Sequence, residues 1–454
     1  MQNRIYFLLL IALCMLAIPL GAQEDETTNP VTLRFGVRVE LPDPRLMNDF
    51  VETFAAENPA IDEVIWEQGG GTGFDCGTTN AQGHFSADET LDLAPLLAAD
   101  ADFDETAYLT GIFDGVTTTD GMIQGLPLVF LPEALWIDVV AFEDAGLPLP
   151  RNGWTVDEFS IALNTLDATE LIEIPDSLRL YSNRHILLLT GSLGGLPLDY
   201  RTTPPTPQFT TPQTVTALQA ISNLVLQNAL DYSPLFTLDV IRRTANTATS
   251  APIQIEQVGL GGRRLLPERF NAGEGYIVAP YPTNPDGPAV VSYSTISGTI
   301  NASTDYANAC YQLLRELGNR PDVFLSPPAR LDLVDDPAFL ESDVVVLAEY
   351  ITAFEAKISA TDTPAVVVPP FYEDANFWPN QWFNRAFDQI IGGSTPANAL
   401  TVAQSHTEAY YICMEPVLNA STLPADELQQ AVSACAQAVD PDGYVLLFGE
   451  NAGD

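Results

Sequence analysis

Lysine is almost missing from this chain of 454 residues, in which Lys357 is the one example. Lys and Arg together number 18 against 60 Asp and Glu, which gives a formal net charge of −42 at pH 7. Nucleic acids and anionic membrane surfaces attract clustered cations, so we expect neither as a partner. The sequence also lacks C-x-x-C, H-E-x-x-H and G-x-S-x-G motifs, and its three histidines, His84, His185 and His406, lie far apart. These absences argue against redox, metalloprotease and serine-hydrolase chemistry.

Apolar residues are plentiful despite the acidity. They make up 46% of the chain, with 22 Phe, 15 Tyr and 5 Trp, whereas only 17% of residues are charged. A disordered acidic chain has few aromatic residues, so this composition predicts a folded protein. The length indicates two to three domains.

The first residues have the pattern of a secretory signal. Arg4 precedes an apolar run over residues 5–20, and small residues follow up to Ala22. We expect a signal peptide over residues 1–22 and a secreted or extracytoplasmic protein, in a periplasm or at a cell surface. A membrane anchor is the alternative, and lipidation at Cys14 is a second one that Leu13 disfavours because a small residue normally precedes a lipidated cysteine.

Four cysteines remain after the signal peptide: Cys76, Cys310, Cys413 and Cys435. An even number in an exported protein permits disulfides, and four cysteines allow three pairings. Cys413 and Cys435 flank a proline-containing turn between two helical stretches, so we expect a local bridge between them. Free buried thiols are the alternative, and the pairing of the other two cysteines stays open.

Periodicity predicts an α/β sheet near the N-terminus. Alternating apolar residues over 31–39 predict a strand, a helix follows between Pro44 and Asn58, and a second strand covers residues 63–67. A strand, a helix and a strand in this order form a right-handed parallel unit. Further helices are expected at residues 138–145, 211–230 and 305–317, a strand at 289–296, and a mainly helical C-terminal third.

Two short motifs are weak signals for ligands. The glycine-rich residues 69–73 lack the lysine of a phosphate-binding loop, so we interpret them as a tight turn. The acidic run from Asp100 to Glu105 is similar to the start of a calcium loop, but Glu105 and Gly111 stand where such a loop needs Gly and Glu. We interpret this run as a solvated, helix-capping segment, and we expect no metal and no cofactor.

The middle of the chain resembles a known family. Residues 120–127, 133–138, 142–148 and 153–159 look like the signature of the extracellular solute-binding proteins of ABC importers, in the sugar-binding class similar to maltose-binding protein. The resemblance implies a periplasmic-binding-protein-like α/β fold with two discontinuous lobes joined by a hinge. The lobes it implies are residues 31–128 plus 292–325 and residues 129–291 plus 326–454, with crossings near 127–130, 289–293 and 320–328. Residues 74–84 depart from the family, because a short polar loop is expected there instead of a helix and a strand.

The resemblance also implies a ligand site between the lobes. A sugar site needs aromatic rings for the apolar faces of the sugar and carboxylates or amides for its hydroxyl groups. Each aromatic candidate could equally belong to the core. The candidate side chains are Glu40, Gln68, Phe130, Glu133, Trp136, Tyr181, Asn183, Tyr293, Trp378 and Trp382.

The function that the resemblance implies is that of a monomeric, non-enzymatic receptor. It would capture a neutral solute, above all a saccharide, and deliver it to the membrane permease of an ABC importer. The alternative is a secreted carbohydrate-active hydrolase, because an acidic protein readily supplies the two carboxylates that glycoside hydrolysis requires.

Overall fold

A computed structural model of the protein describes most of the chain. The described residues are 31–69, 73–80, 89–118, 121–166, 171–173, 182–232, 251–257, 275–285, 287–334, 347–363, 365–369, 374–418 and 425–448. The expected signal peptide, Cys14, His84, Tyr181 and the side chain of Asn183 lie outside the described part of the chain.

The expected parallel unit at the N-terminus is confirmed. Strand β1 (Val31–Val37) pairs in parallel with β2 (Ile61–Gln68), and α2 (Pro44–Glu57) connects them. Asp43 caps the helix by accepting a hydrogen bond from the backbone N–H of Arg45, and Pro44 occupies its first turn. The buried side chains recur at the helical period and cover one face of the sheet. They are Met47, Phe50, Val51 and Phe54.

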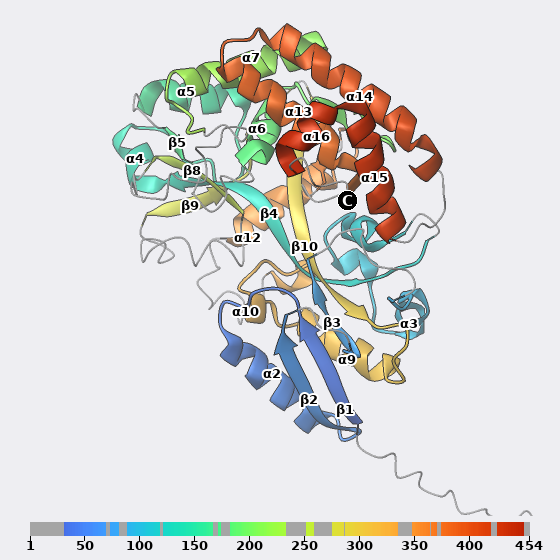
Figure 1. The fold of residues 1–454 in the computed structure, drawn as a ribbon. Helices are drawn as coiled ribbons and strands as arrows, with labels where there is room; N and C mark the ends of the chain where they lie inside the picture. The colour runs from blue at the N-terminus through green and yellow to red at the C-terminus, as the bar shows by residue number, and fades with distance from the viewer. Residues whose placement is uncertain are drawn as a thin grey trace, which may run out of the picture.

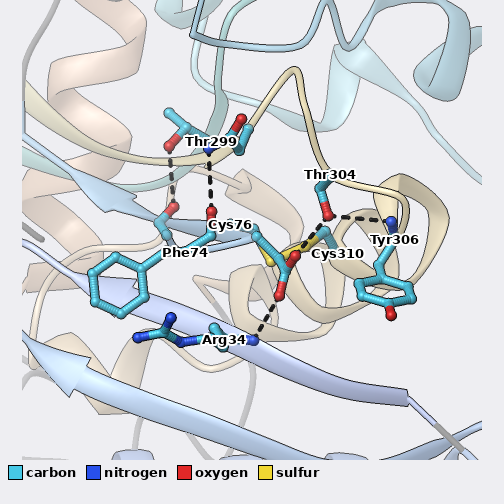
Figure 2. The surroundings of a disulfide bond; sticks show 10 residues. Arg34, Phe74, Cys76, Thr299, Thr304, Tyr306 and Cys310 are labelled. Atoms are coloured by element: carbon cyan, nitrogen blue, oxygen red, sulfur yellow. Dashed lines mark hydrogen bonds between the residues drawn. A yellow bond between two sulfur atoms is a disulfide. The ribbon is translucent and has the colours of Figure 1, made fainter. Parts of the chain in front are cut away.

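The expectation of a polar loop after β2 is wrong, because a third strand, β3 (Cys76–Thr79), lies within residues 74–84. It pairs in parallel with β1 and antiparallel with β10 (Val290–Ile300). Gly77 permits this close pairing, since a Cβ there would lie 2.4 Å from the carbonyl oxygen of Gly36. A disulfide joins Cys76 to Cys310 on α9 (Ala307–Gly318), and Figure 2 shows it beside Arg34 and Thr304.

One sheet runs through both halves of the molecule. Its strand order is β2-β1-β3-β10-β4-β8-β5, with β4 (Leu126–Asp138), β8 (Ile253–Gln257) and β5 (Ile172–Glu173). Two further strands branch from it: β9 (Tyr276–Ala279) pairs with β4, and β11 (Val366–Val368) pairs with β10. The long strands β4 and β10 run side by side from the upper to the lower part of Figure 1.

Helices cover the sheet in two groups (Figure 1). The lower group consists of α2, α9, α3 (Ala94–Ala99) and α10 (Pro321–Phe324). The upper group begins with α4 (Val139–Asp144), α5 (Val156–Leu166), α6 (Ser182–Ser192) and α7 (Pro212–Leu226). It is completed by α13 (Asp374–Ile391), α14 (Pro396–Leu418), α15 (Ala425–Val439) and α16 (Pro441–Phe448). Helix α12 (Leu347–Ile358) lies between the two groups.

The helices expected from periodicity are present as α4, α7 and α9, and the C-terminal third is helical as expected. The expected Cys413–Cys435 bridge is present and joins α14 to α15. No helix in the described ranges has the length and apolar character needed to cross a membrane.

Each half has its own hydrophobic core, and β4 contributes to both. Ala134 belongs to the first core and Trp136 packs against it, whereas Leu135 and Ile137 belong to the second. Successive side chains of a strand point to opposite faces. Over residues 134–137, one face of β4 therefore packs against the first core and the other against the second, whereas both faces of residues 128–131 belong to the first core.

Candidate functional site

Three chain segments lie side by side where the two cores meet. Val129 of β4 is paired with Ile296 of β10 on one side and bridges to Pro328 on the other. The N–H of Phe130 donates to the carbonyl of Pro327 at 3.0 Å, which fixes the third segment against β4. The expected crossings near 127–130 and 289–293 connect the two cores, but the one expected near 320–328 does not, because Phe324 before it and Tyr350 after it both belong to the first core. The chain passes to the second core at β11, where Val367 packs against the first core and Val368 belongs to the second.

A buried polar cluster adjoins these crossings on the side of the second lobe. Glu133 of β4 is only 7% exposed, and its Oε1 lies 3.6 Å from Nε of Arg184 on α6. Its Oε2 lies 3.8 Å from Nδ1 of His185 and has no hydrogen-bond partner in the described part of the chain. The guanidinium of Arg184 also donates to the hydroxyl of Ser292 on β10. The cluster therefore joins β4, β10 and the first turn of α6.

Burial controls the protonation of this cluster. It raises the pKa of Glu133, which the nearby Arg184 partly offsets, and it lowers the pKa of His185 to about 3. Burial also raises the pKa of Tyr281 well above its usual value. Neutral His185 forms a hydrogen bond between its Nδ1 and the Tyr281 hydroxyl over 2.7 Å, and its tautomer decides which of the two donates.

Helix α12 contacts both lobes next to the cluster. Its Tyr350 donates to the backbone carbonyl of Glu133 at 3.2 Å, and Lys357 donates to the carbonyl of Tyr281 at 3.3 Å. On its other side, Glu355 accepts hydrogen bonds from Thr110 in the first lobe. The helix is thus attached to both sides of the junction.

Two of the expected ligand-binding rings pack under α12. The ring of Phe130 lies 5.7 Å from that of Phe354, and the ring of Tyr293 lies 6.0 Å from it. Phe130 is fully buried and Tyr293 is 6% exposed. The structure brings these two side chains together, and their partners are side chains of the first core.

Trp378 and Trp382 lie in the helical layer of the second lobe. Trp378 stacks on Tyr444 of α16 at 5.6 Å, and Trp382 donates from Nε1 to Oδ2 of Asp440 at 2.9 Å. Trp382 also packs against His406 and Tyr410 of α14. Both rings are almost fully buried and fasten α13 to the helices that follow it.

The remaining expected side chains are more accessible. Glu40 and Gln68 are exposed and adjoin each other at the carboxyl ends of β1 and β2, where the Gln68 amide approaches the carbonyl of Val39 at 3.5 Å. Ligands commonly bind at the carboxyl ends of parallel strands. Trp136 is half-buried on the face of β4 that meets the first lobe.

Sequence reasoning missed Arg184, Tyr281, Tyr350 and Lys357 as members of the site. The sole lysine was a usable signal, because a residue type that occurs once in a chain is more informative than one that occurs many times. Arg184 and His185 directly follow the expected Asn183, but nothing local indicates that they face Glu133. Within the described ranges, no group of His, Cys, Asp and Glu could hold a metal ion.

Comparison with known proteins gives structural relatives only. No protein-family model and no curated protein sequence matches the chain. The sugar-binding protein MalE from Xanthomonas citri matches at a TM-score of 0.64 and 15% identity, over 83% of this chain and 96% of that one.

Two further structures match over similar lengths. An ABC substrate-binding protein from Listeria monocytogenes in complex with cycloalternan has a TM-score of 0.59 and 15% identity, over 84% and 98% of the two chains. A solute-binding protein from Agrobacterium vitis with bound D-mannitol has a TM-score of 0.56 and 18% identity, over 83% and 97%. The chain therefore has the two-lobe α/β fold of periplasmic-binding proteins, as found in the sugar-binding proteins of ABC importers.

Proposed function

We propose that the protein is an extracytoplasmic receptor that captures a neutral, hydroxyl-rich solute between its lobes and passes it to the permease of an ABC importer. The observation that carries this proposal is the junction itself, where the adjacent strands β4, β10 and β11 connect two separate cores. Such a junction permits one lobe to rotate against the other. A solute that contacts both lobes stabilises the closed arrangement by its greater affinity for it.

The fold relatives support this class of ligand. Their names mention cycloalternan, D-mannitol and a sugar-binding function. In this chain, we place the solute between Trp136 of the second lobe and the side chains of Glu40 and Gln68 in the first lobe. Glu133 stabilises the strand that carries Trp136, because its buried carboxylate is held by Arg184.

The lobe boundaries belong to the same proposal. They are residues 31–128 plus 292–325 for the first lobe and residues 129–291 plus 326–454 for the second. Tyr350 and Phe354 of α12 pack into the first core, so this helix from the second segment serves the first lobe. We further propose that the protein acts as a monomer.

A thermal-shift experiment tests the proposal. Maltose, D-mannitol, ribitol and D-tagatose are added separately to the purified mature chain, and a solute at 100 times its dissociation constant should stabilise the fold by about 2.7 kcal/mol. Trp136→Ala should abolish the thermal shift. The control variant Trp66→Ala, which replaces a half-buried tryptophan of β2, should keep it. A shift that survives Trp136→Ala unchanged contradicts the proposed site.

The hydrolase alternative gives a different result in the same samples. Chromatography after incubation with maltose should recover the sugar intact if the protein is a receptor. Release of glucose would support the hydrolase. The two buried carboxylates of the described residues, Glu133 and Asp440, are held by Arg184 and Arg385 in separate places, which favours the receptor.

A further inference from the structure

A cavity of about 230 Å³ opens on the first lobe. The turn η1 (Glu105–Ala107), helix α9, Leu126 of β4 and residues 330–332 surround it. Its buried side chains, Leu126, Tyr108 and Tyr311, belong to the first core, and none of its lining residues belongs to the second. The cavity is therefore a property of one lobe and does not depend on closure of the two.

Tyr108 is the unusual group in this cavity. Its side chain is nine-tenths buried, and its ring packs against Phe103 and Phe113 at 5.8 and 5.1 Å. Its hydroxyl forms no hydrogen bond with any described residue and is accessible to a molecule in the cavity. Burial raises the pKa of Tyr108 to about 12, so the hydroxyl keeps its proton and can both donate and accept.

Three of the four charged groups that act on this hydroxyl also line the cavity. They are Arg330, Asp332 and Arg315. The hydroxyl end of Tyr108 therefore faces the cavity, between two ion pairs. One joins Arg315 to Asp100 at 2.8 Å, and the other joins Arg330 to Asp332 at 2.6 Å.

The paired charges decide which class of ligand fits. Both cations have a carboxylate beside them, and Asp102 and Asp104 add two more carboxylates to the lining. A charged ligand of either sign would meet a like charge in this space. A neutral compound with several hydroxyl groups avoids this repulsion, because each hydroxyl can accept from an arginine and donate to a carboxylate.

The size of the cavity and its aromatic side chains restrict the class of ligand further. The volume lies below the range of about 300–1,000 Å³ that drug-sized ligands occupy, so it suits a single ring. Phe103 and Tyr108 offer aromatic surface for the apolar face of such a ring. We propose that this cavity is a second binding site, which takes one sugar ring or a short polyol and completes the hydrogen bonding of the Tyr108 hydroxyl.

Fluorine NMR tests the site directly. The chain is labelled with 3-fluorotyrosine, and the resonance of Tyr108 is identified by its loss in Tyr108→Phe. Methyl α-D-glucopyranoside and ribitol should each shift this resonance with millimolar midpoints. Sodium glucuronate and glucosamine hydrochloride should bind about tenfold more weakly, which corresponds to about 1.4 kcal/mol.

Two variants separate this site from the proposed interlobe site. Trp136→Ala should leave the shift of the Tyr108 resonance unchanged, even if it abolishes the thermal shift. In the Trp136→Ala protein, the additional substitution Tyr108→Phe should weaken the binding of either probe about tenfold, as measured by ligand-observed saturation-transfer NMR. Tyr306→Phe, at an exposed tyrosine of the same lobe, should have no effect.

A Tyr108 resonance that does not respond to either neutral probe would overturn the second site. So would a response that disappears in Trp136→Ala, because the resonance would then report on events between the lobes. Neither outcome bears on whether the interlobe site binds its own solute, which the thermal shift measures separately.

Discussion

Glu355 of α12 accepts two hydrogen bonds from Thr110, one from its backbone N–H at 3.1 Å and one from its hydroxyl at 2.6 Å. Two residues further along the same helix, Lys357 donates to the carbonyl of Tyr281. Helix positions two apart point in nearly opposite directions, since each residue turns by about 100°. The helix therefore holds the first lobe with one side and the second lobe with the other.

Glu355→Ala should reduce the free energy of unfolding by about 0.5–1.5 kcal/mol, because Thr110 loses both hydrogen bonds. Urea denaturation followed by circular dichroism measures the loss. Glu349→Ala is the matched control, since Glu349 is an exposed carboxylate on the same helix. Equal losses in the two variants would mean that the contact with Thr110 contributes nothing specific.

Lys357 should make the protein more stable as the pH rises from about 8 to about 10. Burial lowers the pKa of its amine to about 8, against 10.5 for a free lysine. Between these values the unfolded chain binds a proton that the folded chain does not, so stability rises by up to about 1.4 kcal/mol per pH unit. The difference in unfolding free energy between the wild type and Lys357→Met should follow this slope. Parallel pH profiles would contradict it.

His185 should act in the opposite pH range. Its pKa is lowered to about 3 in the folded protein, whereas the unfolded side chain titrates near 6.5. Its contribution is therefore complete above pH 6.5 and falls as the pH decreases toward 3. His185→Asn keeps an acceptor for Tyr281 and removes the titration, so its stability should decline less between pH 7 and pH 5. A decline as steep as that of the wild type would show that His185 is not the responsible group.

The two disulfides should differ in their effect on stability. Cys413 and Cys435 are 22 residues apart, whereas Cys76 and Cys310 are 234 apart. The entropy of closing a loop in the unfolded chain grows with its length, and it corresponds to about 3 kcal/mol for the short loop and about 5 kcal/mol for the long one. Paired Cys→Ala replacements, compared by urea denaturation, should show the larger loss for Cys76 with Cys310. The reverse order would indicate that local packing outweighs chain entropy.

Local patterns were sufficient to predict the first parallel unit. The spacing of Met47, Phe50 and Phe54 and the capping residue Asp43 lie within one short segment, so the helix could be delimited without knowing its surroundings. Strand β3 was missed because four residues that include Gly77 carry too little periodic signal. Its place in the sheet depends on β10, which lies more than 200 residues later in the chain.

The candidate site was less predictable because its contacts are between distant segments. Trp382 has the spacing of a core residue and of a ligand-binding residue alike, and its partner Asp440 is 58 positions away. Glu133 was expected to contact a ligand hydroxyl, and only the packing of α6 shows that Arg184 lies beside it. A sequence pattern records which side chains one segment can offer, but not which of them another segment will cover.

The continuous sheet has a consequence for how the chain can be made. β10 lies between β3 and β4, so the earliest strands obtain their central neighbour only after about two thirds of the protein has been synthesised. Until then β3 and β4 each present an unpaired edge, and Cys76 has no partner sulfur. Neither lobe can therefore be complete at the ribosome before most of the polypeptide has emerged.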